Sequence, residues 1–135
     1  MGDCIFCKII NKEIACHKVY EDEDNLAFLD VTPIAKGHTV IIPKEHVKTL
    51  TDISDEKLQS LFLAVKKVQQ TLQDKLNPLG FNGGWNNEEV AGQTVPHLHI
   101  HVLPRYHGDG GGSIHSIVSD PQVPVEEVAE LFKDE

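Results

Sequence analysis

The sequence has little positive charge and no long hydrophobic run. Arg105 is the only arginine, and the formal net charge at pH 7 is −9. A surface of this sign repels a phosphate backbone, so we expect no binding to nucleic acid in general, although a small anion can bind where donors are concentrated. No apolar stretch approaches the length of a membrane span, and no basic stretch leads into a hydrophobic signal at the N-terminus. We therefore expect a cytoplasmic protein with no membrane partner.

Cysteine is also scarce. The three cysteines are Cys4, Cys7 and Cys16, and an odd number without a secretion signal does not indicate a disulfide framework. Cys4 and Cys7 form a Cys-x-x-Cys pair, which on its own leaves zinc, a redox dithiol and chance open. A redox dithiol is expected within a βαβ unit, and no such pattern is evident.

The length and the periodicity of the chain indicate one domain with both helices and strands. With 135 residues it most simply forms a single domain, residues 1–135, with a sizeable core. The clearest element is a helix over residues 54–76, in which apolar residues recur at helical spacing. Ser54 can cap its first turn, and Pro78 stops it. Short helices are predicted over residues 5–14 and after Pro124. Short strands are predicted near residues 17–20, 26–29, 37–44 and 81–86.

Histidine occupies three alternate positions in the segment 95–105, followed at once by Arg105. In a strand, alternate side chains point to one face. We predict that His97, His99 and His101 form one row of imidazoles, and that the residues between them are buried on the opposite face: Leu98, Ile100 and Val102. Arg105 either supplies a donor for a small anion or ends the strand in solvent.

Two simpler interpretations of the histidines are a half-exposed strand and an adventitious metal site. Lysine, threonine or glutamate would serve a merely solvated face better, and three of the eight histidines are concentrated in this one segment. A functional row is therefore favoured.

At these residues the sequence resembles the histidine-triad (HIT) family, whose mark is His-x-His-x-His followed by apolar residues. The preceding Gly92-Gln93-Thr94-Val95 and the segment Gly37-His38-Thr39-Val40-Ile41-Ile42-Pro43-Lys44 also match the family. The resemblance implies an α+β fold: an antiparallel sheet of about five strands, a long helix and short terminal helices. It also implies a homodimer whose two sheets join edge to edge. His38 is expected to have a structural role only.

The resemblance assigns roles to the three histidines and to a nucleotide pocket. His99 is the expected nucleophile, His101 contacts phosphate and assists leaving-group protonation, and His97 orients its neighbour. Apolar residues are candidate contacts to the base: Ile5, Phe6, Ile9, Ile14 and Phe28. Asp30 is expected to accept hydrogen bonds from the ribose hydroxyls, which suits a carboxylate. Asn86, Gln93 and Thr94 are expected to donate to the α-phosphate.

Each of these contacts has a simpler alternative. The apolar residues can serve the core alone, and Asp30 can cap the turn before Pro33. Gln93 and Thr94 can make ordinary loop hydrogen bonds. Histidines next to them in sequence favour the phosphate assignment.

The resemblance also completes a structural zinc site around the Cys-x-x-Cys pair. Its expected ligands are Cys4, Cys7, His46 and His97, two thiolates and two imidazoles, which is a usual set for tetrahedral zinc. The alternative is that the cysteines are merely small buried residues. No organic cofactor is expected.

Together these assignments predict a nucleotide hydrolase or transferase with a small nucleotide substrate. It would cleave the α-phosphate linkage of a nucleoside monophosphate joined to an amine, a polyphosphate chain or a sulfate, through a nucleotidyl-histidine intermediate. The opposing hypothesis is a zinc-stabilised nucleotide-binding or scaffolding protein with little catalytic role. The residues leave the base, the leaving group and the pathway open.

Overall fold

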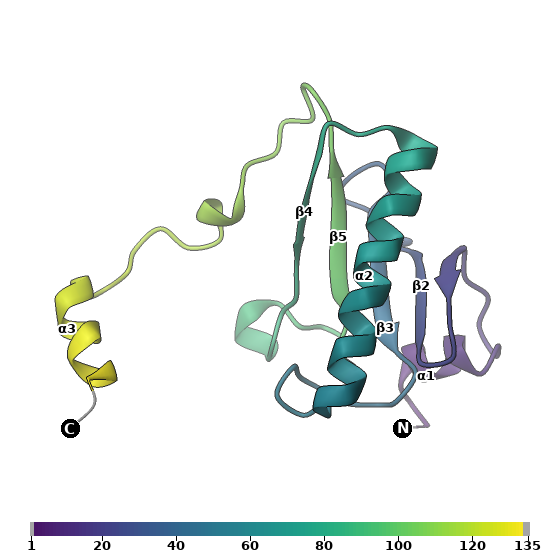
Figure 1. Cartoon of the computed structure of the whole chain (residues 1–135), viewed down its shortest axis with the longest axis horizontal. Coiled ribbons are helices and arrows are strands. Elements are labelled where there is room, and N and C mark those ends of the chain that lie inside the picture. Colours follow the sequence, from purple (N-terminus) through teal and green to yellow (C-terminus); the bar gives the residue numbers. More distant parts are fainter. Residues whose placement is uncertain (1, 134–135) are drawn as a thin grey trace.

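The computed structural model describes residues 2–133 and contains a five-stranded antiparallel sheet with one long helix across one face (Figure 1). The strands lie in the order β1-β2-β3-β5-β4. Their bounds are β1 Lys18–Glu21, β2 Asn25–Leu29, β3 Thr39–Pro43, β4 Gly80–Gly84 and β5 Ile100–Arg105. Both the number of strands and their antiparallel pairing confirm the predicted fold class.

The long helix, α2, spans Asp55–Leu76, as the apolar periodicity predicted. The Ser54 hydroxyl accepts a hydrogen bond from the Lys57 amide at 3.3 Å and caps the first turn. Asn77 ends the helix in the left-handed conformation, with φ of 51°. The inner face of α2 packs against alternate residues of the histidine segment in one core cluster, which contains Leu61, Ala64, Val68, Leu98, Ile100 and Val102.

A second cluster lies on the opposite face of the sheet, beneath the short helix α1 (Ile5–Ile10). It is formed by Phe6, Leu26, Phe28, Val40 and Ile42, with Cys4 at its edge. The middle strands are thus buried on both faces, and the histidine side of the segment has apolar neighbours as well. Helix α1 is shorter than the predicted span to residue 14, because Lys12 adopts a left-handed φ of 66° soon after its end.

The strand that carries the histidines begins later than predicted. Strand β5 starts at Ile100, so His97 and His99 lie just before it. The pairing of β3 with β5 runs only to Ile41 and Ile100. Near the end of β3, Pro43 has no amide hydrogen with which to continue the pairing. The Leu98 amide is bonded outside the sheet, to the Val47 carbonyl at 2.7 Å.

Beyond β5 the chain leaves the sheet. A tight turn over residues 106–112 leads into a segment of residues 113–133, which ends in the short helix α3 (Val125–Ala129). This confirms the short helix predicted after Pro124. No helix within residues 2–133 combines the length and apolarity that crossing a membrane requires. The single domain predicted over residues 1–135 includes residues 1 and 134–135, which lie outside the described part.

Candidate active site

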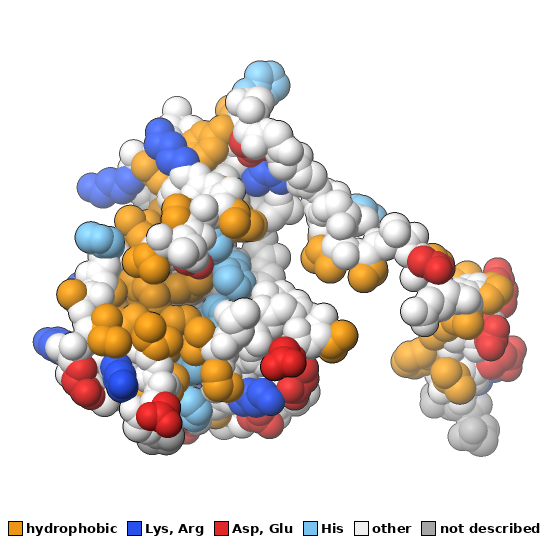
Figure 2. Space-filling model, turned by 180° about the vertical axis from the view of Figure 1, so that it is seen from behind, with side chains coloured by type: hydrophobic (Ala, Val, Ile, Leu, Met, Phe, Trp, Pro, Cys, Tyr) orange, Lys and Arg blue, Asp and Glu red, His pale blue; other side chains and the backbone are white. Residues whose placement is uncertain are grey.

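The histidines lie on the face of the sheet opposite α2, beside an apolar region (Figure 2). The rings of His99 and His101 are 5.0 Å apart between centroids, and the edge of Phe6 meets His99 at the same distance. His97 is fully buried and His99 is 8% exposed. This part of the segment thus offers two neighbouring imidazoles, one of which lies at the bottom of a largely apolar surface.

The hydrogen bond of His99 determines which of its ring nitrogens is free. Its Nδ1 lies 2.7 Å from the backbone carbonyl oxygen of His97. A carbonyl only accepts, so Nδ1 carries the proton and Nε2 keeps its lone pair. Burial lowers the pKa of His99 below its ordinary value, which favours the neutral ring. His99 is therefore oriented and protonated as a nucleophile requires.

His101 is hydrogen-bonded to His38, a residue for which the sequence predicted a structural role only. The Nε2 of His38 lies 2.9 Å from the Nδ1 of His101, and the Ile34 amide donates to the Nδ1 of His38 at 3.3 Å. Neutral His38 therefore carries its proton on Nε2 and donates to His101, whose own proton must lie on Nε2. Burial lowers the pKa of His101 to about 4 and also lowers the pKa of His38. The result is a neutral hydrogen-bond donor next to a neutral imidazole with a free lone pair.

No local pattern indicated the role of His38. It precedes β3 by one residue, and β3 pairs with β5 so that Val40 lies opposite His101. That neighbourhood is visible only once the two strands are paired. The His38 ring also lies 3.5 Å from an oxygen of Asp30, at the end of β2.

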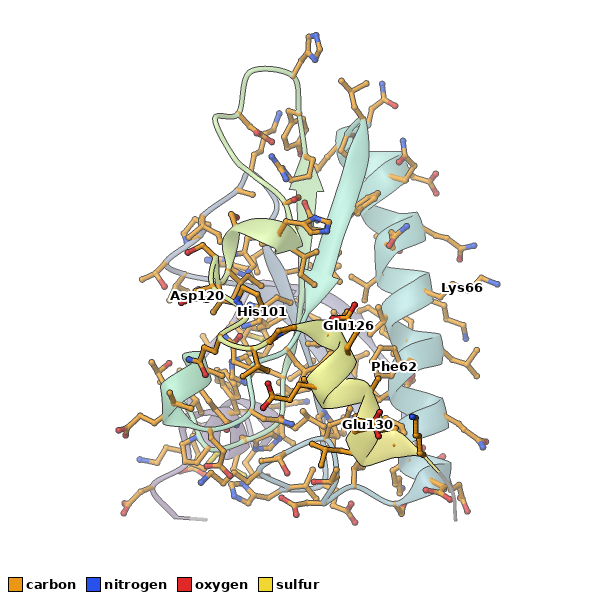
Figure 3. All side chains as sticks on the ribbon, turned by 90° about the vertical axis from the view of Figure 1, so that its left-hand side faces the viewer. Phe62, Lys66, His101, Asp120, Glu126 and Glu130 are labelled. Carbon is orange, nitrogen blue, oxygen red and sulfur yellow. The ribbon has the colours of Figure 1, made fainter. Side chains whose placement is uncertain are left out.

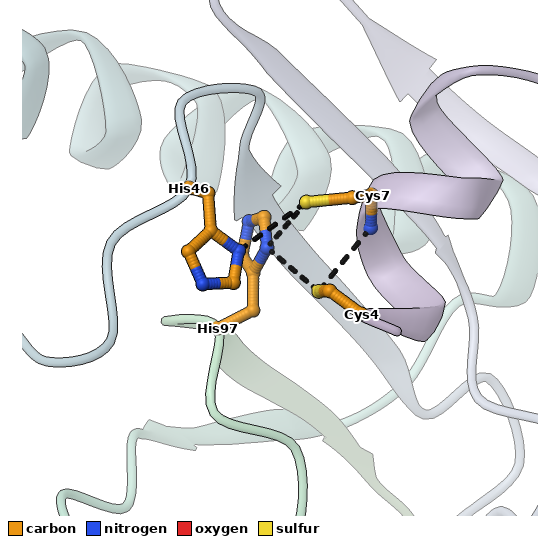
Figure 4. A group of neighbouring side chains, drawn as sticks. All are labelled: Cys4, Cys7, His46 and His97. Atoms are coloured by element: carbon orange, nitrogen blue, oxygen red, sulfur yellow. Dashed lines mark hydrogen bonds between the residues drawn. The ribbon is translucent and has the colours of Figure 1, made fainter. Parts of the chain in front are cut away.

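The ring of His97 faces a different group of residues, so the predicted row is divided. Its Nε2 lies 2.8 Å from the Pro43 carbonyl oxygen, which places the proton there and leaves Nδ1 bare. That Nδ1 lies 3.4 Å from the Sγ of Cys4 and 3.7 Å from the Sγ of Cys7. The Nδ1 of His46 is 3.2 Å from the Sγ of Cys7 (Figure 4). His97 thus contacts the cysteine cluster with its ring and His99 with its backbone.

The four residues of this cluster can hold a metal ion. Their donor atoms all lie within 4.8 Å of one another. Tetrahedral zinc, with bonds of ~2.3 Å to sulfur and ~2.0 Å to nitrogen, would separate its donors by about 3.3–3.8 Å, close to the three distances above. The hydrogen bond from His97 to a backbone carbonyl is the usual support for a metal-bound imidazole. Burial raises the pKa of the Cys7 thiol, so metal binding there would release a proton.

The apolar residues predicted to contact the base occupy two environments. Phe6 and Phe28 are buried with ring centroids 5.6 Å apart, and Ile9 packs beside them. Ile5 and Ile14 are exposed. The buried members serve the core, and Phe6 also contacts His99. Their contact with a base stays a prediction.

The predicted polar contacts already have partners within the chain. One oxygen of Asp30 accepts from the amide and hydroxyl of Thr32, which is the turn-capping alternative. The Gln93 amide nitrogen donates to the Lys48 carbonyl, and its oxygen accepts from the Glu88 amide, each at 2.8 Å. Gln93 therefore links the loop that contains Lys48 to the loop that contains Glu88. Its phosphate role and the ribose role of Asp30 stay predictions.

The two remaining predicted contacts lie closer to the surface. The Asn86 side chain lies against Gly92, whose φ of 104° suits glycine. Thr94 is exposed and lines a hollow of about 300 Å³ together with Cys4 and His46. This hollow adjoins the cysteine cluster and is not lined by His99. The phosphate contacts assigned to Asn86 and Thr94 therefore remain predictions.

Comparison with known proteins identifies close relatives. A family model described as HIT domain matches residues 11–108. The protein hit of Bacillus subtilis is 46% identical over 123 residues, which cover 90% of this chain and 85% of that protein. An adenosine 5'-monophosphoramidase of Schizosaccharomyces pombe is 41% identical over 102 residues, covering 76% of this chain and 74% of that one. A crystal structure of a HIT family protein from Bacillus anthracis is similar with a TM-score of 0.84 at 41% identity, covering 96% of this chain and 92% of that chain.

Proposed function

The chain belongs to the HIT domain family, and on that basis we propose that it hydrolyses or transfers a nucleoside monophosphate joined through its α-phosphate to another group. The observation that carries this proposal is the pair of hydrogen bonds that leaves the Nε2 of His99 bare and the Nε2 of His101 protonated. A nucleophile beside a hydrogen-bond donor is the arrangement that attack on phosphorus requires. The similarity to a monophosphoramidase supports a phosphoramidate as the first substrate to test.

The proposed reaction has two steps. The Nε2 lone pair of His99 forms a bond to the α-phosphorus, and the bond from phosphorus to the leaving nitrogen or oxygen breaks. That atom keeps the electron pair and takes a proton from water, assisted by a hydrogen bond from His101. Water then attacks the same phosphorus, which releases the nucleoside monophosphate and a proton and restores neutral His99. Positioning and charge stabilisation supply most of the rate enhancement.

We also propose that Cys4, Cys7, His46 and His97 bind a structural zinc ion. Zinc would supply no reacting group there; it would hold α1 to the histidine segment. The support is the donor set and its spacing. Because the His97 carbonyl orients His99, an ordered His97 also keeps the nucleophile in place.

The two edges of the sheet support the proposed homodimer. Strand β1 has charged residues, Lys18 and Glu21, and an irregular register after Lys18, which are features that discourage pairing. Strand β4 has the sequence GFNGG, without charge or proline. Beside it lie the exposed rings of Phe62 on α2 and of Trp85, with their centroids 6.3 Å apart. We propose that two copies pair through β4 and α2.

We also propose that the protein acts in the cytoplasm on a small nucleotide. We propose no nucleic-acid or membrane partner.

One experiment tests the catalytic proposal. Wild type, His99→Ala and His107→Ala are incubated with an AMP–lysine amide and with diadenosine polyphosphates, and AMP release is measured. His107 lies in the exposed turn after β5 and serves as the matched control. We expect release by wild type and His107→Ala only, and a trapped nucleotide on His99 by mass spectrometry. If neither substrate releases AMP in a His99-dependent manner, the result would favour the non-catalytic nucleotide-binding protein.

A further inference from the structure

The two cysteines at the start of helix α1 are placed so that their sulfur atoms can bond to each other. Cys4 caps the helix, and Cys7 lies in its first turn. The Cys7 amide donates to the Cys4 Sγ at 3.4 Å, so the sulfur of Cys4 lies against the turn that carries Cys7. Both residues are free thiols, and their sulfur atoms are within 4.8 Å of each other. An S–S bond of ~2.05 Å can therefore form by rotation of the two side chains within one turn.

A small molecule can reach this pair from the solvent. Cys7 is half-buried, and Cys4 lines the hollow of about 300 Å³ together with His46 and Thr94. The surroundings are not those of a disulfide oxidoreductase, because the strand pairings of the described sheet are all antiparallel and α1 belongs to no βαβ unit. The effect of oxidising the pair therefore falls on its own neighbours.

Two of these neighbours connect the pair to the proposed nucleophile. Phe6 lies between the two cysteines in the chain, and its ring meets the His99 ring with centroids 5.0 Å apart. The Nδ1 of His97 lies 3.4 Å from the Cys4 Sγ (Figure 4), and the His97 carbonyl accepts the Nδ1 proton of His99. A disulfide would move the Cys4 sulfur and the first turn of α1, and so would disturb both contacts that orient His99.

The main core lies on the other side of the sheet. In a view from the β4 edge, His101 is on one side and α2, with Phe62 and Lys66, is on the other (Figure 3). Helix α1 packs on the face opposite α2, over a separate apolar cluster. Oxidation of the pair should therefore change the histidine face while the core beneath α2 stays folded.

We propose that Cys4 and Cys7 form a reversible disulfide that lowers the activity of the site, with a small-molecule disulfide as the oxidant. One cysteine sulfur attacks a sulfur of the oxidant and displaces a small thiol; the other cysteine sulfur then attacks the first and displaces the second small thiol. Starting from two thiols, the pair gives up two electrons and two protons, which leave on the two small thiols. Zinc-bound thiolates would react in the same way, with the protons taken from water.

The bond would also abolish the proposed zinc site, because a disulfide offers no thiolate and the pair supplies two of the four ligands. In a reducing cytoplasm such a bond is transient, as a regulatory disulfide requires. The effect on activity rests on the proposed function, whereas formation of the bond does not.

Mixtures of oxidised and reduced glutathione in varied ratio test the bond itself. Free thiols are blocked and the full chain is cut by trypsin, which cleaves after Lys8 and Lys12 and so separates both members of the pair from Cys16. In wild type and Cys16→Ser, the peptide of residues 1–8 should become lighter by two hydrogen atoms. In Cys7→Ser this internal bond should not form. A wild-type peptide that stays reduced at every ratio would overturn the proposal.

A second measurement tests the effect on the site. In Cys16→Ser, which retains only the pair, AMP release should fall at least about tenfold on oxidation and return after reduction in the presence of zinc, since a misplacement of ~1 Å can cost ~100-fold in rate. Cys7→Ser should show the same AMP release before and after oxidation. Nitrogen NMR should show His99 changing from one tautomer to a mixture when the bond forms in Cys16→Ser.

Formation of the disulfide with unchanged AMP release and an unchanged His99 spectrum would overturn the proposed effect on the site. A reduced chain that releases no AMP would contradict the proposed function instead. In that case the His99 spectrum still decides whether the disulfide acts on the site, so the two failures are distinguishable.

Discussion

The ring Nδ1 of His99 lies 2.7 Å from the backbone carbonyl oxygen of His97, whose own side chain faces the cysteine cluster. The orientation of the proposed nucleophile therefore depends on a residue that is held from its other side by Cys4 and Cys7. A substitution in the cysteine cluster should therefore affect the reaction by moving the His97 carbonyl, which orients the His99 ring.

Replacing His38 should reduce turnover more than substrate binding. In His38→Asn, the shorter side-chain amide does not extend to the position of the His38 Nε2, so the donor to the Nδ1 of His101 is lost and the protonated nitrogen of His101 is no longer determined. We expect kcat to fall by about 10- to 100-fold with little change in KM, and nitrogen NMR to show mixed tautomers of His101. His107→Asn is the control. A rise in KM at constant kcat would instead indicate a role in substrate binding.

The pH dependence of kcat/KM should show an acid limb below the ordinary range of histidine. The nucleophile must be unprotonated, and burial lowers the pKa of His99 from its ordinary value of 6.5. Activity should therefore persist as pH falls through 6.5 and decline only at lower pH, where the ring gains a proton. The rate of AMP release measured from pH 4 to 8 tests this. A midpoint above 6.5 would show that the charge of Asp30 and the carbonyl of His97 stabilise the protonated ring by more than burial destabilises it.

Zinc content should follow the cysteine cluster and not the third cysteine. Cys7→Ser removes one of the four proposed donors and should lose most of its zinc and unfold at a lower temperature. Cys16→Ser should keep both properties of the wild type. Elemental analysis and thermal unfolding of untagged protein measure the two quantities. Wild type with intact thiols and no stoichiometric zinc would exclude the metal site.

Weakening the hydrogen bonds of the Arg105 guanidinium to Asp109 and Asn82 should make the turn over residues 106–112 more mobile without unfolding the sheet. In Arg105→Lys, the planar donor that binds both oxygens of Asp109 is replaced by a single ammonium group. We expect faster amide hydrogen exchange over residues 106–112. Exchange in α2 should stay as in the wild type, because its core contacts lie elsewhere. Unchanged exchange in the turn would mean that its own backbone conformation is sufficient.

The packing of α2 on the sheet should dominate stability. Leu61 is fully buried, so Leu61→Ala should lower the free energy of unfolding by about 2–5 kcal/mol. Leu79 is 76% exposed, and Leu79→Ala should change the free energy of unfolding by less than about 0.5 kcal/mol. Urea unfolding of both variants measures the difference. Similar losses for the two would contradict the packing described here.

Several features were predictable because their signals are local. The span of α2 follows from the apolar repeat and the Ser54 cap, and the burial of Leu98, Ile100 and Val102 follows from their alternation. The start of β5 was predicted too early, because the ladder depends on Pro43 in another strand. Helix α1 was predicted too long, since the left-handed turn at Lys12 has no apolar signature.

The sequence by itself determined the elements, the alternation of the histidine segment and the resemblance that points to His99. Only the tertiary structure decided what each imidazole does. His38 meets His101 across paired strands, and His97 meets Cys4 from 93 positions away in the chain. Which ring nitrogen bears the proton is set by the acceptor or donor opposite it. That partner comes from a distant segment, so no local pattern can specify it.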